Sequence, residues 1–151
     1  MSIRRYDIDS AVADAFVAYL AAKIDPALQN VSPVITIFDP MAVDEANRFI
    51  VEVKNWKTDP ASPGMFTGQV KCVTKSRWNK PTWQADRIAH YDRFNWMTDV
   101  LMSSTLADDV STNTAGVVID FIKPSREFTP VVHEGFIYSE ILIEFAGYFQ
   151  A

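Results

Sequence analysis

The stretch Gly135–Phe145, GFIYSEILIEF, alternates between two sets of side chains and decides the fold. This alternation is typical of a β-strand, because successive side chains point to opposite faces of a sheet. One face would carry Phe136, Tyr138, Glu140, Leu142 and Glu144, and the other Ile137, Ser139, Ile141, Ile143 and Phe145. A shift of one residue would exchange the two faces, so the sequence predicts a strand with a well-determined register.

Shorter stretches before it are also predicted strands, because they are rich in β-branched residues or alternate in the same way. They are Val34–Phe38, Arg48–Lys54, Gly68–Lys75 and Gly116–Ile122. Asp39-Pro40 follows the first of these, and Lys123-Pro124 is expected to stop the fourth. Lys57–Gly64 (KTDPASPG) contains two prolines and a glycine, and it is therefore predicted to be a loop.

Two segments show the three- and four-residue spacing of apolar side chains that is typical of amphipathic helices. In Ser10–Ile24 the apolar positions are Val12, Phe16, Tyr19, Leu20 and Ile24. In Trp83–Leu106 the predicted buried stripe is Ile88, Tyr91, Phe94, either Met97 or Thr98, and Leu101. A polar loop is expected at Asp108–Ala115.

The predicted order of elements is α-β-β-β-α-β-β. This order indicates an α+β fold with an antiparallel or mixed sheet and two main helices. A length of 151 residues suits a single domain covering residues 1–151. The 48% hydrophobic content excludes a disordered chain, and the lone Cys72 excludes a disulfide scaffold. No apolar run approaches the roughly 18 residues of a membrane helix. The sequence turns acidic directly after Arg4 and Arg5, so its start does not resemble a signal peptide.

Charge is unevenly distributed along the chain. Residues 1–53 carry a net charge of −4, residues 54–93 carry +5, and residues 94–151 carry −6. A basic middle could bind nucleic acid, or it could meet an acidic segment of a neighbouring copy. The sequence pI near 4.9 favours the second interpretation, because nucleic-acid-binding domains are usually basic.

The residues that usually carry catalysis are sparse. The two histidines are His90 and His133, and a single histidine on a helix, as His90 is, is usually a surface or packing residue. The lysines near Cys72 are expected on the opposite face of its strand, so Cys72 is interpreted as a small core residue. The sequence has no zinc, calcium or glycine-rich phosphate-binding motif, and no cofactor is predicted.

One pattern favours an alternative. Asp39-Pro40 followed by Glu52-Val53-Lys54 on a strand resembles the D…ExK motif of restriction-endonuclease-like nucleases. In such a site two carboxylates hold Mg²⁺, and a lysine on the glutamate's face of the strand assists the reaction. The order Asp-Pro is inverted here, however, and a helix is missing after Lys54. A Mg-dependent nuclease is therefore the alternative to a non-enzymatic role.

Tryptophans that flank predicted loops form the remaining feature. They are interleaved with basic residues, a combination that can stack bases, anchor protein contacts or line the edge of a core. We predict that this segment forms a protein interface, in which the basic side chains project from the core. The predicted interface residues are Trp56, Lys71, Lys75, Arg77, Trp78 and Lys80.

The whole layout resembles the tail terminator, or tail-completion, proteins of long-tailed, siphovirus-like bacteriophages. The resemblance rests on the N-terminal helix, the strand pair, the long helix Arg87–Leu101 (RIAHYDRFNWMTDVL) and the closing stretch Gly135–Tyr148. It implies a structural, non-enzymatic virion protein of the phage neck, assembled in the host cytoplasm. It further implies a ring, expected to be a hexamer, that caps the tail tube protein and meets the head-completion or connector protein. Neither a membrane nor a specific nucleic-acid sequence is an expected partner.

Overall fold

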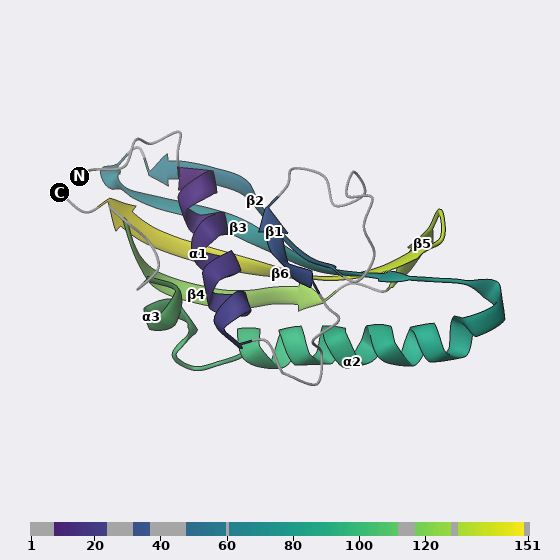
Figure 1. The fold of residues 1–151 in the computed structure, drawn as a ribbon. Coiled ribbons are helices and arrows are strands. Elements are labelled where there is room, and N and C mark those ends of the chain that lie inside the picture. The colour runs from purple at the N-terminus through teal and green to yellow at the C-terminus, as the bar shows by residue number, and fades with distance from the viewer. Residues whose placement is uncertain are drawn as a thin grey trace.

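A six-stranded sheet with helices packed on one face makes up the described part of the chain (Figure 1). The computed structural model describes residues 8–23, 32–36, 48–59, 61–111, 117–127 and 130–149. The helices are α1 (Ile8–Lys23), α2 (Trp83–Leu101) and α3 (Leu106–Ser111), with a short 3₁₀ turn, η4 (Lys80–Thr82). The strands are β1 (Ser32–Thr36), β2 (Arg48–Asp59), β3 (Ser62–Arg77), β4 (Val117–Glu127), β5 (Val131–His133) and β6 (Phe136–Phe149).

The strand order in the sheet is β1-β2-β3-β6-β4, and β5 pairs with β6 beyond the end of β4. β1 runs parallel to β2, and all the other neighbours are antiparallel. The predicted α+β fold with a mixed sheet is therefore confirmed. The order of elements also matches the prediction, apart from the additional short elements α3 and β5.

β6 is an inner strand of the sheet and has the two faces that its alternating sequence predicts. It pairs with β3 from Phe136 to Tyr148 on one side and with β4 on the other. Ile141, Ile143 and Phe145 enter the main core, whereas Tyr138 points to the outer face, which is the face turned away from the helices. Because both edges of β6 are paired and one face is buried, its register is fixed.

The main core lies between the sheet and all three helices. It includes the predicted positions Val12, Phe16, Tyr19 and Leu20 of α1, whereas Ile24 lies outside the described residues. From the sheet it takes Phe49, Phe66, Val70 and Cys72 among others, and from α3 it takes Leu106 and Val110. α1 therefore buries the face that its apolar spacing predicts.

Four predicted boundaries are wrong. Much of the expected loop Lys57–Gly64 is strand, because β2 and β3 stay paired up to Asp59 and Ser62. β4 continues past Lys123-Pro124, because it is an edge strand. An edge strand can accommodate a proline, although proline has no N–H to donate to a neighbouring strand. The second helix ends at Leu101, and the start of the expected polar loop Asp108–Ala115 belongs to α3.

The predicted stripe of α2 is right in its second half and wrong in its first. Phe94, Met97 and Leu101 are buried, but Ile88 and Tyr91 are exposed. In the first half of the helix the inward position is held by His90, which is fully buried. The helix therefore turns a polar side chain inward and apolar side chains outward at this end.

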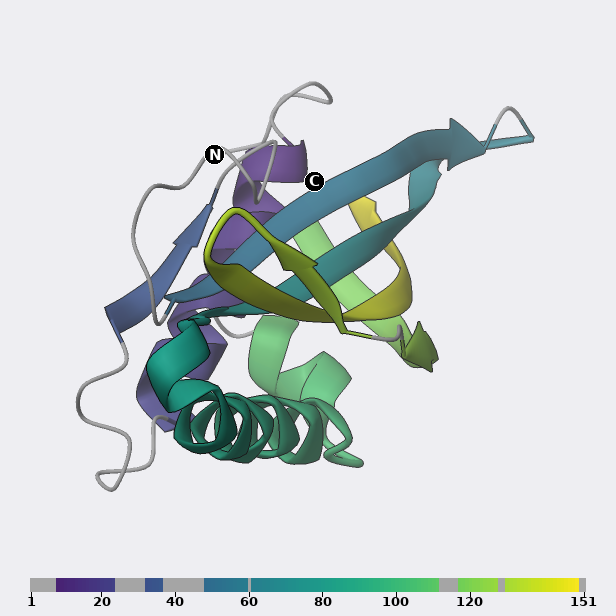
Figure 2. The same cartoon turned by 90° about the vertical axis from the view of Figure 1, so that its right-hand side faces the viewer.

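The sheet and helix extend together away from the main core, as the right-hand side of Figure 1 shows. We call this extension, residues 74–91 and 131–139, the distal arm. At its end a two-residue turn joins β5 to β6, and both Glu134 (φ 48°) and Gly135 (φ 81°) have positive φ, as a type I′ turn requires. Figure 2 views α2 nearly end-on, below the strands of the arm.

Candidate interface at the end of the distal arm

Aromatic and basic side chains from three elements meet at the end of the distal arm. β3 ends at Arg77, η4 reverses the chain, and α2 begins at Trp83. The ring centroids of Trp78 and Trp83 lie 6.3 Å apart, and the Arg87 guanidinium lies 5.8 Å from the centroid of the Trp83 ring. This distance permits a cation–π contact on the helix surface.

Local hydrogen bonds hold this end in place. The carboxylate of Asp86 accepts hydrogen bonds from the Asn79 N–H and the Thr82 hydroxyl, both at 3.0 Å. The Trp78 N–H donates to the carbonyl of Gly135 in the β5–β6 turn at 2.9 Å. A carboxylate in the first turn of a helix is also favoured by the helix dipole. The reversal between β3 and α2 is therefore tied to both neighbouring elements.

The surface made by these residues is accessible and positively charged. Arg77, Lys80 and Arg87 are exposed, and 42% of the Trp83 surface is exposed. Trp78 is half-buried beneath them. Exposed tryptophan beside arginine is a combination that is enriched at the centres of protein interfaces. We call these five residues the distal patch.

Exposed carboxylates also lie on elements toward the opposite end of the molecule (Figure 1). Asp99 lies near the end of α2, Asp108 lies on α3, and Asp120 lies near the start of β4. α3 and the start of β4 are joined, since the Ser111 hydroxyl donates to the carbonyl of Ile119 at 2.7 Å. Among the described residues, the exposed cations Arg77, Lys80 and Arg87 therefore lie at the distal end together with the carboxylates of Asp86 and Glu134, and the exposed carboxylates of Asp99, Asp108 and Asp120 lie toward the other end.

The six predicted interface residues fall into two groups. Arg77, Trp78 and Lys80 come together in the distal patch. The other three lie apart from the patch: Trp56 is on β2, Lys71 is in the middle of β3, and Lys75, near the end of β3, is buried on the outer face. The sequence order suggested one continuous segment, but β3 is long enough to separate its own two ends.

Trp56 is turned toward the core by a β-bulge. Lys54 pairs with Gln69 and Lys57 with Thr67, so Asn55 and Trp56 together oppose the single residue Gly68. Asn55 takes the left-handed conformation that such an extra residue often needs, with φ of 54°. Trp56 consequently packs against the main core and is half-buried.

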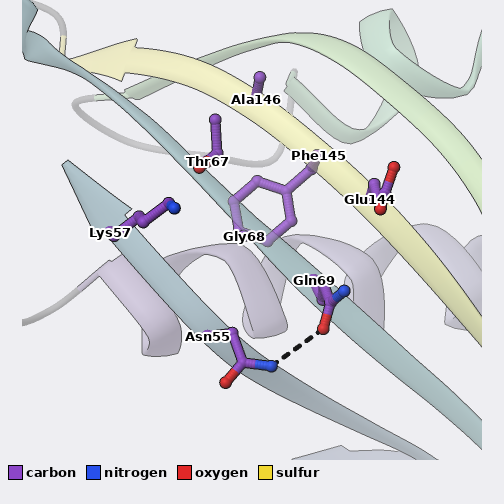
Figure 3. Close-up of a pocket in the computed structure, with 8 residues that line it drawn as sticks. All are labelled: Asn55, Lys57, Thr67, Gly68, Gln69, Glu144, Phe145 and Ala146. Carbon is purple, nitrogen blue, oxygen red and sulfur yellow. Dashed lines mark hydrogen bonds between the residues drawn. The ribbon is translucent and has the colours of Figure 1, made fainter. Parts of the chain in front are cut away.

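The bulge leaves a shallow depression of about 360 Å³ on the sheet, shown in Figure 3. Gly68 forms part of its floor, where a Cβ atom would lie only 2.6 Å from Phe145 Cζ. The Asn55 amide donates to Gln69 Oε1 at 3.0 Å, and Lys57 and Glu144 lie on the rim. The lining residues include no nucleophile paired with a base, so the depression has no catalytic arrangement.

The prediction that Lys75 projects from the core is wrong. Its side chain is only 1% exposed, and its ammonium lies 4.1 Å from the ring centroid of Phe136 and 5.4 Å from that of Tyr138. The alternation of β3 correctly places Lys75 on the outer face. At this position, however, β6 brings two aromatic rings across the strand and covers the lysine.

Lys71 also has partners within the chain. Its ammonium lies 3.8 Å from Glu52 and 3.5 Å from Glu140, so one lysine joins carboxylates from β2 and β6 across β3. Glu52 and Lys54 both lie on the outer face, as the nuclease alternative requires, but Glu52 is engaged by Lys71. Asp39, the other carboxylate of that motif, lies outside the described residues.

His90 makes the most specific polar contacts of the arm. Its Nδ1 lies 2.7 Å from the Ser76 hydroxyl and its Nε2 lies 2.7 Å from the Ser139 hydroxyl, so it joins α2 to β3 and β6. Burial, with a smaller contribution from Arg93, lowers the pKa of His90 to about 4. The imidazole is therefore neutral at pH 7. Ser76 lies 14 residues before His90 and Ser139 lies 49 residues after it, so no local sequence pattern predicts this cluster.

Cys72 is buried in the main core, as predicted, and burial raises its pKa to about 12. It is therefore a thiol at neutral pH and not a nucleophile. Within the described residues, no group of His, Cys, Asp and Glu side chains is arranged to hold a metal ion. No helix there is both long enough and apolar enough to cross a bilayer.

No protein-family model matches the chain, and no curated protein matches it either. The function proposed below therefore rests on the distal patch and on the acidic end, the name used here for the end that carries the exposed Asp99, Asp108 and Asp120.

Proposed function

We propose that this chain is a structural subunit of a homo-oligomeric ring of the tail-terminator type. In this proposal the ring, a hexamer, caps the tail tube of a long-tailed phage and meets the head-completion or connector protein. The chain would act in the virion, without a cofactor, a membrane or a specific nucleic-acid sequence as partner. The proposal rests on the resemblance of its layout and on the surface properties of the described residues.

The observation that carries the proposal is the difference between the two ends of the molecule. A closed ring needs two different surfaces on each subunit, because every copy contacts its neighbours head to tail. The distal patch offers tryptophan and three cations, and the end that holds α3 offers Asp99, Asp108 and Asp120. Opposite charges on two such surfaces favour one orientation of approach.

Native mass spectrometry of the purified protein tests the ring. We expect a particle of several 17.0-kDa copies that falls apart as ionic strength rises, because exposed charge pairs are screened by salt. Reversing Arg77 and Lys80 to glutamate should lower the assembled fraction, whereas Lys57→Glu, an exposed change on β2, should leave it unchanged. A parent protein that stays monomeric at high concentration and does not limit tail length would contradict the proposal.

The nuclease alternative has its own test. The shared face of Glu52 and Lys54 is the observation in its favour, and the ion pair from Lys71 to Glu52 opposes it. Incubating the protein and a Glu52→Ala variant with plasmid and Mg²⁺ decides between them. Cleavage by the parent that is lost in the variant would replace the ring proposal with the nuclease.

A further inference from the structure

The two ends of α2 expose apolar side chains of different kinds. α2 starts at the distal end with Trp83 and runs back toward the body, where α3 follows it (Figure 1). Trp83 is 42% exposed, and Met102, one residue beyond the end of the helix, is 52% exposed. Single exposed apolar residues are common on protein surfaces, so the surroundings of these two decide what they can do.

A shallow hollow of about 410 Å³ lies beside Trp83 at the tip of the distal arm. Five consecutive residues line it: Pro81, Thr82, Trp83, Gln84 and Ala85. The Thr82 hydroxyl donates to the Asp86 carboxylate at 3.0 Å, and the Trp78 ring lies 6.3 Å from the Trp83 ring between centroids. These contacts fix the outline of the hollow, so it can receive one apolar side chain of a partner.

Met102 lies at a well-ordered corner between α2 and α3. Its N–H donates to the carbonyl of Thr98 at 3.0 Å and to that of Asp99 at 3.3 Å, and the Leu106 N–H donates to the Ser103 carbonyl at 3.2 Å. A methionine side chain is flexible and polarizable, and its sulfur makes favourable contacts with aromatic rings. An exposed methionine is therefore suited to a hollow with a tryptophan wall. We call Asp99, Met102 and Asp108 the α2–α3 corner.

The exposed charges beside the hollow and beside Met102 differ in sign. The Arg87 guanidinium lies 5.8 Å from the centroid of the Trp83 ring, whereas the α2–α3 corner carries Asp99 and Asp108. A carboxylate near the C-terminus of a helix is disfavoured by the helix dipole. The last turn of α2, which is described in full, carries no basic residue to offset Asp99. A cation from another molecule would offset it.

Each surface also has a neighbour of the opposite charge. Asp86 and Glu134 lie at the distal end, and Asp86 is engaged in two hydrogen bonds. On the body, the Lys23 ammonium lies 5.9 Å from the ring centroid of Tyr19, whose hydroxyl donates to the carbonyl of Val100 at 2.6 Å. The difference in charge is therefore modest. It would orient the contact, while the apolar side chains supply most of the affinity.

We propose that Met102 of one copy of this chain occupies the hollow beside Trp83 of the next copy, with the cations of the distal patch facing the carboxylates of the α2–α3 corner. This inference rests on the proposed ring, because it names the contact between its subunits. The hollow and Met102 lie about 28 Å apart, at the two ends of the 19-residue helix α2. Each copy therefore uses the two surfaces with two different neighbours, as a head-to-tail ring requires.

Substitutions on both sides of the contact test it in the full-length protein. Met102→Ser should weaken association by about tenfold in sedimentation velocity, because a buried apolar side chain is lost, and Met102→Leu should retain association. Ala85→Phe should weaken association similarly, because the added ring fills the hollow. Met65→Ser is the matched control: it changes a methionine of β3 that is 43% exposed, and it should have no effect.

Cross-linking tests the direction of the contact. Gln84 lines the hollow, and Ser104 is an exposed neighbour of Met102. A chain with both Gln84→Cys and Ser104→Cys should give a ladder of covalent multimers with a short bismaleimide. Either single variant alone should stay monomeric on a denaturing gel, and the buried Cys72 should not react.

The outcomes separate this contact from the ring itself. Efficient cross-linking of Gln84→Cys chains to one another would mean that like ends meet, and it would overturn the proposal. If the parent forms a ring and either Met102→Ser or Ala85→Phe associates as tightly as the parent, the contact is wrong and the ring stands. A parent that never associates overturns both.

Discussion

The body of the molecule and the distal arm are stabilised in different ways. In the body, three helices and the sheet enclose a continuous apolar core that includes Phe16, Phe66 and Phe145. In the arm, the first half of α2 is joined to the strands through His90 and two serine hydroxyls, while Trp83, Ile88 and Tyr91 are exposed. The body therefore uses its apolar residues internally, whereas the arm leaves them available to another molecule.

The largest expected effect lies in the body. Phe145→Ala should lower the free energy of unfolding by about 3–5 kcal/mol, because the ring is 2% exposed and its removal leaves a cavity against Phe66, 6.0 Å away between ring centroids. Urea denaturation measures this loss. If Phe145→Ala were as stable as the parent, the core would not be continuous on this side of the sheet.

The pH dependence of the arm should follow His90. Its pKa is lowered from 6.5 in the unfolded chain to about 4 in the folded protein, so the neutral form stabilises the fold. That stability is fully present above pH 6.5 and is lost as the pH falls to about 4, by about 3 kcal/mol in total.

The measurement is the free energy of unfolding of the parent and of His90→Gln between pH 7 and pH 4. The advantage of the parent over the variant should shrink by this amount as the pH falls. His133→Gln, at the exposed histidine of β5, should keep the acid response of the parent. An unchanged difference between the parent and His90→Gln across the range would show that the arm is not held by the neutral imidazole.

Alanine substitutions at two glycines of β3 distinguish the effect of steric crowding from the effect of a stiffer backbone. Gly68→Ala should cost about 1–3 kcal/mol, because the new Cβ would lie 2.6 Å from Phe145 and 3.0 Å from Trp56. Gly64→Ala has no atom within 4 Å of its Cβ and should change stability by less than about 0.5 kcal/mol. Thermal unfolding of the pair distinguishes them, and equal values would mean that the bulge relaxes freely.

The smallest expected effect on stability lies on the exposed side of α2. Ile88→Ser should change the free energy of unfolding by less than about 0.5 kcal/mol, because the side chain is largely exposed in the single chain. A large loss of stability in a dilute, monomeric sample would show that Ile88 contributes to the fold of the arm after all.

The sequence predicted elements well where one local pattern decides the outcome. The two faces of β6 and the buried side of α1 follow from periodicity alone, because both elements lie against the main core. On α2 the sequence offers two apolar stripes, and periodicity cannot tell which one meets the sheet. Ile88 and Tyr91 were predicted to be buried for this reason, although His90 takes the inward position.

The candidate site depended on contacts that are distant in sequence. Alternation places Lys75 on the outer face, but its burial results from Phe136 and Tyr138, about sixty residues later on β6. Trp56 turns inward because Asn55 adopts a positive φ, and an asparagine before a tryptophan in a strand is a weak signal for a bulge. Arg77, Trp78 and Lys80 were found because they are adjacent in the sequence.

The position of β6 also has a kinetic consequence. It is the last described strand in chain order, and yet it pairs with β3, β4 and β5. Its partners on β3 lie roughly seventy residues earlier, so the sheet can close only after a long loop has been brought together, which slows folding. Until then the backbone N–H and C=O groups along one edge of β3 are unpaired, and this interval is when nascent copies are most prone to pair with the wrong chain.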